Sequence, residues 1–79
     1  MFEYHIYGKD ACKYCFMAVA LLTQRDLPFK EFKLGREFTR EELLEQFPSA
    51  KTFPQIKLIS EGGNELKIGG YEDLVKQLG

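Results

Sequence analysis

The chain has 79 residues, which leaves room for one small domain, and we expect a single domain over residues 1–79. Its formal net charge is −1 and 44% of its residues are hydrophobic, so a compact core can form and bulk charge suggests neither nucleic acid nor an anionic membrane as a partner. The apolar N-terminal run is interrupted by Glu3, His5 and Gly8, and neither a signal peptide nor a transmembrane segment is visible. These features predict a cytoplasmic protein.

An alternating run over residues 2–7 predicts the first strand, which Gly8 ends. One of its faces carries Phe2, Tyr4 and Ile6, and the other carries His5 and Tyr7. His5 is the single histidine. A catalytic base is one interpretation, but a histidine satisfied by its neighbours is favoured, because the sequence places no Asp or Glu to orient it.

Both cysteines, Cys12 and Cys15, follow this strand as a C-x-x-C motif and precede a helix-like run. In a reducing compartment such a pair is more often catalytic or metal-binding than a structural staple. The first cysteine falls where unpaired N–H groups open the helix and its dipole favours a negative thiolate. Lys9 and Lys13 add positive charge on both sides. We therefore predict Cys12 as the attacking thiolate and Cys15 as the resolving thiol.

The predicted helix spans residues 13–25 and is followed by an alternating strand over residues 29–34. The segment Asp26-Leu27-Pro28 separates the two. A strand, a helix and a strand in so few residues indicate a β-α-β unit with parallel strands. Residues at helical spacing form the expected inward stripe: Cys12, Cys15, Phe16, Val19 and Leu22.

A second helix is predicted to begin at Thr39, which forms a capping box with Glu42, and to end at Pro48. Phe38 and Leu43 are expected to form a hydrophobic staple across this start. The acidic side of the helix is a partner surface in one interpretation and a solvated face in the favoured one. That side comprises Glu41, Glu42 and Glu45.

The C-terminal segment predicts a hairpin and a last helix. Residues 55–59 and 65–68 read as antiparallel strands across a turn, and residues 71–78 as a helix. Leu74, Val75 and Leu78 are expected to face inward. The complete order, β-α-β-α-β-β-α, predicts an α/β fold in which a four-stranded mixed sheet is flanked by helices.

Three separated segments resemble motifs of the glutaredoxin branch of the thioredoxin fold. Lys9-x-x-Cys12-x-Tyr14-Cys15 is similar to K-x-x-C-P-Y-C, and Thr52-Phe53-Pro54-Gln55 is similar to T-V-P-Q. Gly69-Gly70-Tyr71-Glu72-Asp73-Leu74 is similar to G-G-x-D-D-L. A C-x-x-C alone is a modest signal, whereas three segments in family order over the whole chain are a strong one. The chain is thus identified as a member of the small dithiol glutaredoxins, a group in which viral and phage proteins look similar, with a thioredoxin-like fold.

The resemblance implies that glutathione is a co-substrate bound along these segments. Pro54 would be cis and would leave the backbone of Phe53 open to pair with the cysteinyl part of glutathione. Asp73, with the amides of Gly70 and Tyr71, would hold the γ-glutamyl end.

The resemblance implies further contacts around the first cysteine. Lys9 would meet the glycyl carboxylate of glutathione or stabilise the Cys12 thiolate, and Tyr14 would pack at the rim of the groove. The remaining candidate contacts are Lys13, Gln46 and Thr52. Two positions depart from the family pattern: Lys13 replaces the usual Pro, and Phe53 replaces the usual Val.

The implied reaction is attack of the Cys12 thiolate on a disulfide, commonly a protein–glutathione mixed disulfide, with resolution by Cys15 or by a second glutathione. Expected partners are glutathione and disulfide-containing proteins, ribonucleotide reductase among them, with no nucleic acid and no membrane. We expect a monomer in the cytoplasm, or in the host cytoplasm if the protein is viral, and no metal.

Three alternatives stay open. Thioredoxin reductase is one alternative electron donor, as for small glutaredoxin-like redoxins. A bridging [2Fe–2S] cluster held by two Cys12 thiolates and two glutathiones is another, since the two cysteines of one chain do not close a metal site. An inert structural disulfide is the poorest, because its loop would be tiny and the Lys9, Pro54 and Asp73 arrangement would go unused.

Overall fold

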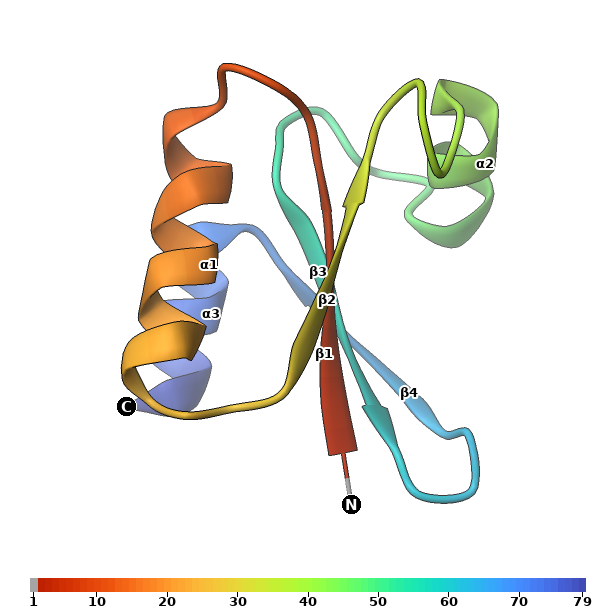
Figure 1. Ribbon diagram of the computed structural model, residues 1–79. Coiled ribbons are helices and arrows are strands. Elements are labelled where there is room, and N and C mark those ends of the chain that lie inside the picture. Colours follow the sequence, from red (N-terminus) through yellow and green to blue (C-terminus); the bar gives the residue numbers. More distant parts are fainter. Residues whose placement is uncertain (1) are drawn as a thin grey trace.

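The structure is a computed structural model that describes residues 2–79, so Met1 of the expected domain lies outside the described residues. The predicted order of elements is confirmed (Figure 1). The observed bounds differ from the predicted ones by at most one residue, except that the second helix was predicted to end at Pro48 and ends at Gln46. The elements are β1 (Phe2–Gly8), α1 (Lys13–Gln24), β2 (Phe29–Lys33), α2 (Arg40–Gln46), β3 (Gln55–Ser60), β4 (Glu65–Gly69) and α3 (Tyr71–Leu78).

The four strands form one mixed sheet in the order β2-β1-β3-β4. β1 is parallel to β2, antiparallel to β3, and places Ile6 opposite Ile56. β3 and β4 form the predicted antiparallel hairpin. Its turn contains Gly62 and Gly63 with φ of 87° and 83°, a backbone conformation that glycine adopts without steric strain. The parallel β-α-β unit and the mixed sheet are therefore confirmed.

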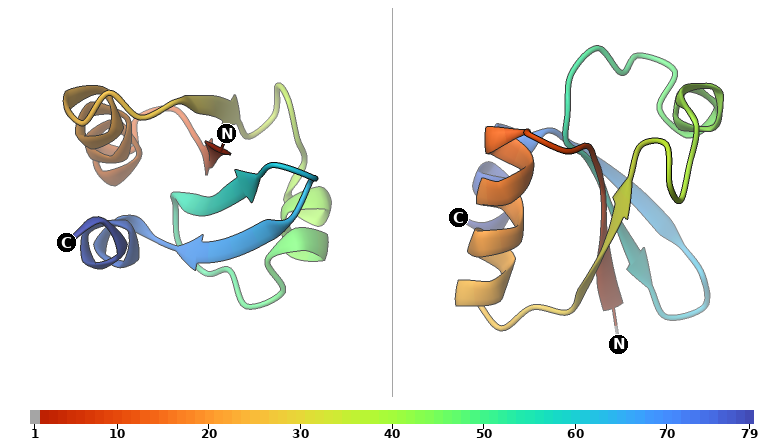
Figure 2. Two further views of the ribbon diagram at one scale, coloured as in Figure 1. Left: turned by 90° about the horizontal axis from the view of Figure 1, so that it is seen from below. Right: turned by 45° about the horizontal axis from the view of Figure 1, so that its top comes forward.

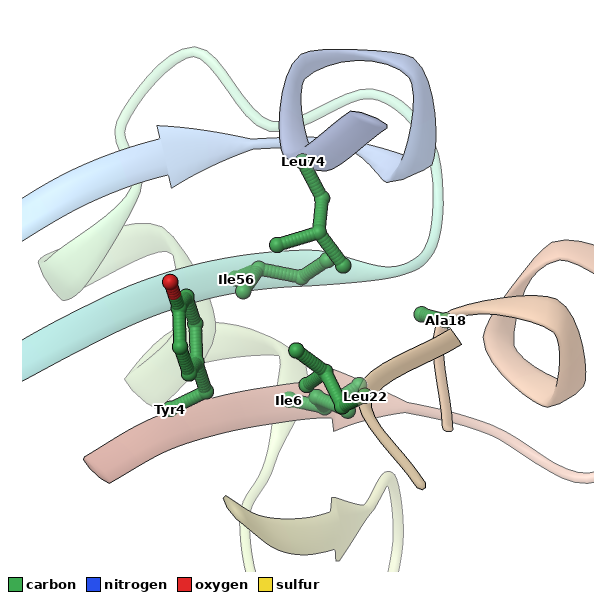
Figure 3. Close-up of a cluster of buried hydrophobic side chains, with 6 residues drawn as sticks. All are labelled: Tyr4, Ile6, Ala18, Leu22, Ile56 and Leu74. Atoms are coloured by element: carbon green, nitrogen blue, oxygen red, sulfur yellow. The ribbon is translucent and has the colours of Figure 1, made fainter. Parts of the chain in front are cut away.

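One face of the sheet is covered by α1 and α3 (Figures 1 and 2). Their side chains and those of β1 and β3 form a hydrophobic cluster, in which even Tyr4 is only 3% exposed (Figure 3). Burial of this apolar surface is the main force that holds the two helices on the sheet. The buried members are Tyr4, Ile6, Ala18, Leu22, Ile56 and Leu74.

Two residues predicted to face this core are exposed instead. Phe16 is 74% exposed and Val75 is 41% exposed. Each follows a buried residue, Cys15 or Leu74, by one position, and one position turns a helix by about 100°. The buried stripe of α1 continues through Ala18, three residues after Cys15, so the predictions for Phe16 and Val75 were wrong.

The other face of the sheet is covered by α2 and carries an aromatic cluster (Figure 2). The ring of Tyr7 stacks on Phe32 with 5.0 Å between centroids and meets Phe38 and Phe47 edge-on. Phe38 and Leu43 are both buried in this cluster, in agreement with the predicted hydrophobic staple.

The start of α2 is held by the predicted capping box. The Glu42 amide donates to the Thr39 hydroxyl at 3.2 Å, and the Thr39 amide donates to the Glu42 carboxylate at 2.7 Å. These two bonds satisfy amides that would otherwise lack a partner at the helix N-terminus.

His5 is satisfied by neighbours on its strand face. Its Nε2 atom lies 2.8 Å from the Glu3 carboxylate, and its ring meets the edge of Phe32 at 5.3 Å between centroids. Glu3 stands two residues earlier, on the same face of the strand, so the view that no acidic residue orients His5 was wrong. Within residues 2–79 no helix combines the length and hydropathy needed to cross a membrane.

Candidate active site

Three loops meet at the end of the β-α-β unit where β1 passes into α1. At this end β1 passes into α1, the loop between α2 and β3 passes into β3, and β4 passes into α3 (Figure 1). The N-termini of α1 and α3 therefore open on the same end of the sheet, and unpaired helix amides there favour negatively charged groups.

Cys12 is the N-cap residue of α1, with extended backbone angles, and it is joined to Cys15 as a disulfide with 5.3 Å between the Cα atoms. The Cys15 amide donates to the Cys12 sulfur at 3.2 Å. Cys12 is partly exposed, whereas Cys15 is 1% exposed. A thiol or disulfide that approaches from solvent therefore reaches the sulfur of Cys12 before that of Cys15.

Gly8, the last residue of β1, has no side chain, and Cys15 occupies the space beside it. A Cβ atom at this position would lie 2.9 Å from the Cys15 sulfur and 3.2 Å from its Cβ atom. Both distances are too short for an unstrained contact, so a side chain here would displace the buried cysteine. The glycine thus fixes how closely α1 approaches the end of β1.

A first hollow lies between the loop before β3 and the start of α3. It brings together six of the predicted site residues, and Pro54, whose peptide bond with Phe53 is cis as predicted, is buried beside it. The six are Tyr14, Thr52, Phe53, Gly70, Tyr71 and Asp73. Tyr14 is 50% exposed, and its ring lies 6.0 Å from that of Tyr71 between centroids.

The start of α3 is arranged around Asp73. Its carboxylate accepts a hydrogen bond from the Gly70 amide at 3.0 Å and so caps the helix. Gly69 has a φ of 112°, and a Cβ atom there would lie 2.5 Å from an Asp73 carboxylate oxygen. Glycine at this position therefore permits both the turn and the return of the carboxylate to the helix start.

A second hollow adjoins Cys12 on the side of α2. Its lining includes Lys9, Arg40, Lys51 and Phe53, and the Lys9 ammonium lies 5.4 Å from the centre of the Phe53 ring. Within residues 2–79, none of these three cations forms an ion pair. The hollow therefore offers positive charge close to the reactive sulfur.

Three cationic residues of the hollows were missed from the sequence. Lys51 and Lys76 line the first hollow, and Arg40 and Lys51 line the second. Lys51 directly precedes the Thr52-Phe53-Pro54 segment, and this adjacency is a signal that could have found it. Nothing in the sequence places Arg40, the first residue of α2, near Cys12.

The other two candidates lie elsewhere. Lys13 lines a third hollow, on the side of β2. Gln46 lines none of the three hollows, and its side-chain oxygen accepts a hydrogen bond from the buried ammonium of Lys57. The structure therefore does not bring Gln46 together with the other candidate residues.

Metal ligands are scarce at this end of the sheet. Across the described part of the chain, no three His, Cys, Asp or Glu side chains are grouped closely enough to hold a metal ion. The two cysteine sulfurs of one chain therefore do not complete a four-ligand metal site with neighbouring His, Asp or Glu side chains.

Known proteins resemble this chain in sequence and in structure. The sequence profile of the glutaredoxin family matches residues 5–60. Glutaredoxin 3 of Escherichia coli strain K12 is 35% identical over 75 residues, which cover 94% of this chain and 83% of that protein. The solution structure of a glutaredoxin from Brucella melitensis is 32% identical, with a TM-score of 0.69 and coverage of 96% of this chain and 77% of that chain.

A further match concerns the fold alone. The crystal structure of glutaredoxin 1 from Francisella tularensis has a TM-score of 0.74 at 20% identity, over 99% of this chain and 93% of that chain. The fold and the Cys12–Cys15 disulfide define a thiol–disulfide oxidoreductase with a thioredoxin-like fold. With 35% identity to a curated relative and a family match over most of its length, the chain belongs to the glutaredoxin family.

Proposed function

We propose that the chain is a glutathione-dependent oxidoreductase that reduces protein–glutathione mixed disulfides through Cys12 and Cys15. The observation that carries the proposal is the position of the accessible Cys12 sulfur beside a cationic hollow, with a helix start and a capping carboxylate at the next hollow. A tripeptide with a carboxylate at each end and an ammonium at one end matches this distribution of charge.

In this proposal glutathione lies along the first and second hollows. Its γ-glutamyl carboxylate meets the amides at the start of α3, and its ammonium meets Asp73. Its cysteinyl part pairs with the backbone of Phe53, next to Thr52 and Pro54. Its glycyl carboxylate meets Lys9, where Arg40 supplies further positive charge.

The proposed reaction begins with the reduced dithiol. The Cys12 thiolate, stabilised by the Cys15 amide and the N-terminus of α1, attacks the glutathionyl sulfur of the mixed disulfide. A bond forms between Cys12 and glutathione, the old disulfide bond breaks, and the protein leaves as a thiolate that takes a proton from water. A second glutathione thiolate then attacks the glutathionyl sulfur, which releases oxidised glutathione and restores the Cys12 thiolate.

Cys15 supplies a second route in the same cycle. Its thiolate attacks the Cys12 sulfur, which releases glutathione and forms the Cys12–Cys15 disulfide. Two glutathione molecules are then needed to reduce this disulfide. We propose that the protein is a monomeric single domain that acts in the cytoplasm on disulfide-containing proteins. Ribonucleotide reductase, a partner implied by the family resemblance, is one candidate.

The test is glutathione-dependent reduction of the mixed disulfide of glutathione and 2-mercaptoethanol. We expect Cys12→Ser to abolish turnover, because the nucleophile is lost, and Cys15→Ser to retain a substantial part of it, because a second glutathione can resolve the intermediate. Asp73→Asn keeps an acceptor for the Gly70 amide but loses the charge, so it should raise the KM for glutathione several-fold.

Two other outcomes would contradict the proposed function. Absence of glutathione-dependent turnover, with rapid reduction of the protein by thioredoxin reductase, would contradict glutathione as the donor and the roles of Asp73 and Lys9. Visible absorption of a [2Fe–2S] cluster in protein purified without oxygen would instead support a cluster-binding module.

A further inference from the structure

Lys76 lies on the wall of the first hollow and has no role in the reaction described so far. It is an exposed residue of α3, and it lines the hollow together with Tyr71 and Asp73 from the first turn of the same helix. Long side chains of a helix point back toward its N-terminus. The Lys76 side chain therefore reaches toward the start of α3, where the γ-glutamyl end of glutathione is proposed to bind.

The Lys76 ammonium stands near two carboxylates of its own helix but pairs with neither. Glu72 precedes it by four residues and Asp73 by three, spacings at which helix side chains are neighbours, and both line the same hollow. Within residues 2–79, Lys76 forms no ion pair with either of them. The Asp73 carboxylate instead accepts from the Gly70 amide at 3.0 Å. The wall of the hollow thus carries a cation and a carboxylate that do not neutralise each other.

Lys76 is also specific to this end of the groove. The other cation that lines the first hollow, Lys51, lines the second hollow as well. The remaining cations of the second hollow, Lys9 and Arg40, do not line the first. Among the described residues, Lys76 is therefore the one cation that lines the first hollow without lining the second, so it can distinguish the two ends of a bound peptide.

The head group of an α-amino acid matches this pair of charges. Its ammonium and its carboxylate are bonded to one carbon atom, so it needs an anion and a cation side by side, and side chains three residues apart on a helix have Cβ atoms about 5–6 Å apart. The γ-glutamyl end of glutathione is such a head group, whereas the glycyl end carries a carboxylate alone. We infer that Lys76 is a specificity-determining residue, which binds the γ-glutamyl carboxylate while Asp73 binds the ammonium. This inference rests on the proposed glutathione-dependent reaction.

The test uses mixed disulfides of 2-mercaptoethanol with glutathione and with two analogues. One analogue has a carboxamide in place of the γ-glutamyl carboxylate, and the other has a carboxamide in place of the glycyl carboxylate. The reduced protein reacts with each disulfide in a single turnover without free glutathione, and the release of 2-mercaptoethanol gives the rate constant. The variants are Lys76→Gln, Lys76→Arg and, as a matched control, Lys30→Gln, which removes the same charge from an exposed lysine of β2 that lines none of the three hollows.

We expect Lys76→Gln to slow the reaction with the glutathione disulfide about threefold, because one exposed charge pair is lost. It should slow the glycyl carboxamide by the same factor and leave the γ-glutamyl carboxamide unchanged, because that analogue has no carboxylate for Lys76 to bind. Lys76→Arg should keep most of the wild-type rate, and Lys30→Gln should change none of the reactions. The symmetric disulfide of 2-mercaptoethanol, which has no glutamyl group, should react equally with all variants.

Two results would overturn the role of Lys76 alone. One is an unchanged rate, or equal slowing by Lys76→Gln and Lys30→Gln, and the other is equal slowing of glutathione and its γ-glutamyl carboxamide by Lys76→Gln. The proposed function would stand in both cases if the wild-type protein reacts faster with the glutathione mixed disulfide than with the symmetric disulfide of 2-mercaptoethanol. If it reacts equally with these two disulfides, glutathione is not recognised, and the proposed function and the role of Lys76 are overturned together.

Discussion

The two faces of the sheet are held together by different kinds of contact. The face under α1 and α3 is buried through apolar side chains from four elements (Figure 3). The face under α2 combines an aromatic cluster with a buried lysine: Lys57, in β3, is only 6% exposed. Its ammonium donates to Gln46 in α2 and to Glu65 in β4, and it lies 5.5 Å from the centre of the Tyr7 ring.

The two faces therefore hold their helices in different ways. The apolar face positions α1, whose first residues follow Cys12, and such packing tolerates little change in volume. The other face holds a helix of seven residues, which is too short to be stable by itself. Specific polar contacts at Thr39 and Lys57 therefore supplement its packing. Within residues 2–79, every buried side-chain nitrogen or oxygen atom has a hydrogen-bond partner.

The largest effect is expected on the apolar face. Leu22→Ala should lower the free energy of unfolding by about 3 kcal/mol, because a fully buried leucine is replaced by a cavity between α1 and the sheet. Chemical denaturation monitored by circular dichroism measures the change. Leu66→Ala, at a 55% exposed leucine, is the control and should change stability by less than about 0.5 kcal/mol. Equal effects of the two variants would show that the face is not tightly packed.

A smaller effect is expected at the buried lysine. Lys57→Ala should lower the free energy of unfolding by about 2 kcal/mol, because hydrogen bonds to Gln46 and Glu65 are lost together with the packing of the stem. Lys57→Met keeps most of that packing and should cost about 1 kcal/mol. Lys67→Met is a matched control, because Lys67 also lies over a ring, that of Phe47, but is exposed.

A more stable Lys57→Met variant would contradict this expectation. It would mean that the cost of burying the ammonium exceeds what its hydrogen bonds contribute. The buried lysine and its hydrogen bonds to Gln46 and Glu65 would then be retained for a reason other than stability.

Because Lys57 contacts Glu65, we also expect the stability of the fold to depend on pH. The hydrogen bond from Lys57, and then its positive charge, lower the pKa of Glu65 below its ordinary value in the folded protein. A carboxyl group with a lowered pKa stabilises the fold at pH values above its ordinary pKa, and this contribution is lost as the pH falls through the folded value. NMR titration of Glu65 should therefore show a lowered pKa that rises in Lys57→Met. An unchanged pKa would contradict the role of the lysine.

The success of sequence reasoning also differs between the two faces. Strand alternation and helix spacing correctly predicted the order of elements and most of the apolar face. They could do so because side chains return to the same face every 2 residues in a strand and every 3.6 residues in a helix. The same reasoning failed for Phe16 and Val75, which lie one position from the buried stripe. A periodic pattern indicates which way the side chains of an element point. It does not indicate how many neighbouring positions on a helix are buried.

No sequence periodicity predicts the polar contacts on the α2 face. Alternation places Lys57 on the same strand face as Gln55, but its burial depends on α2 and β4, which are distant in the sequence. For the site, the three motif segments contain most of the residues that line the first hollow. Arg40 and Lys76 were missed, because their approach to the site depends on how helices and loops pack in space.

The smallest effect is expected at the helix cap on the α2 face. Thr39→Ala should lower the free energy of unfolding by about 1 kcal/mol, because the Glu42 amide loses its acceptor, and Thr39→Ser should restore most of it. Thr23→Ala is the matched control, because its hydroxyl bonds to the Val19 carbonyl inside α1 and caps no amide. That control should be neutral or slightly stabilising, since alanine favours helix interiors. If Thr39→Ala and Thr23→Ala proved equal, α2 would be held by its aromatic packing alone, and the contrast between the two faces would reduce to Lys57.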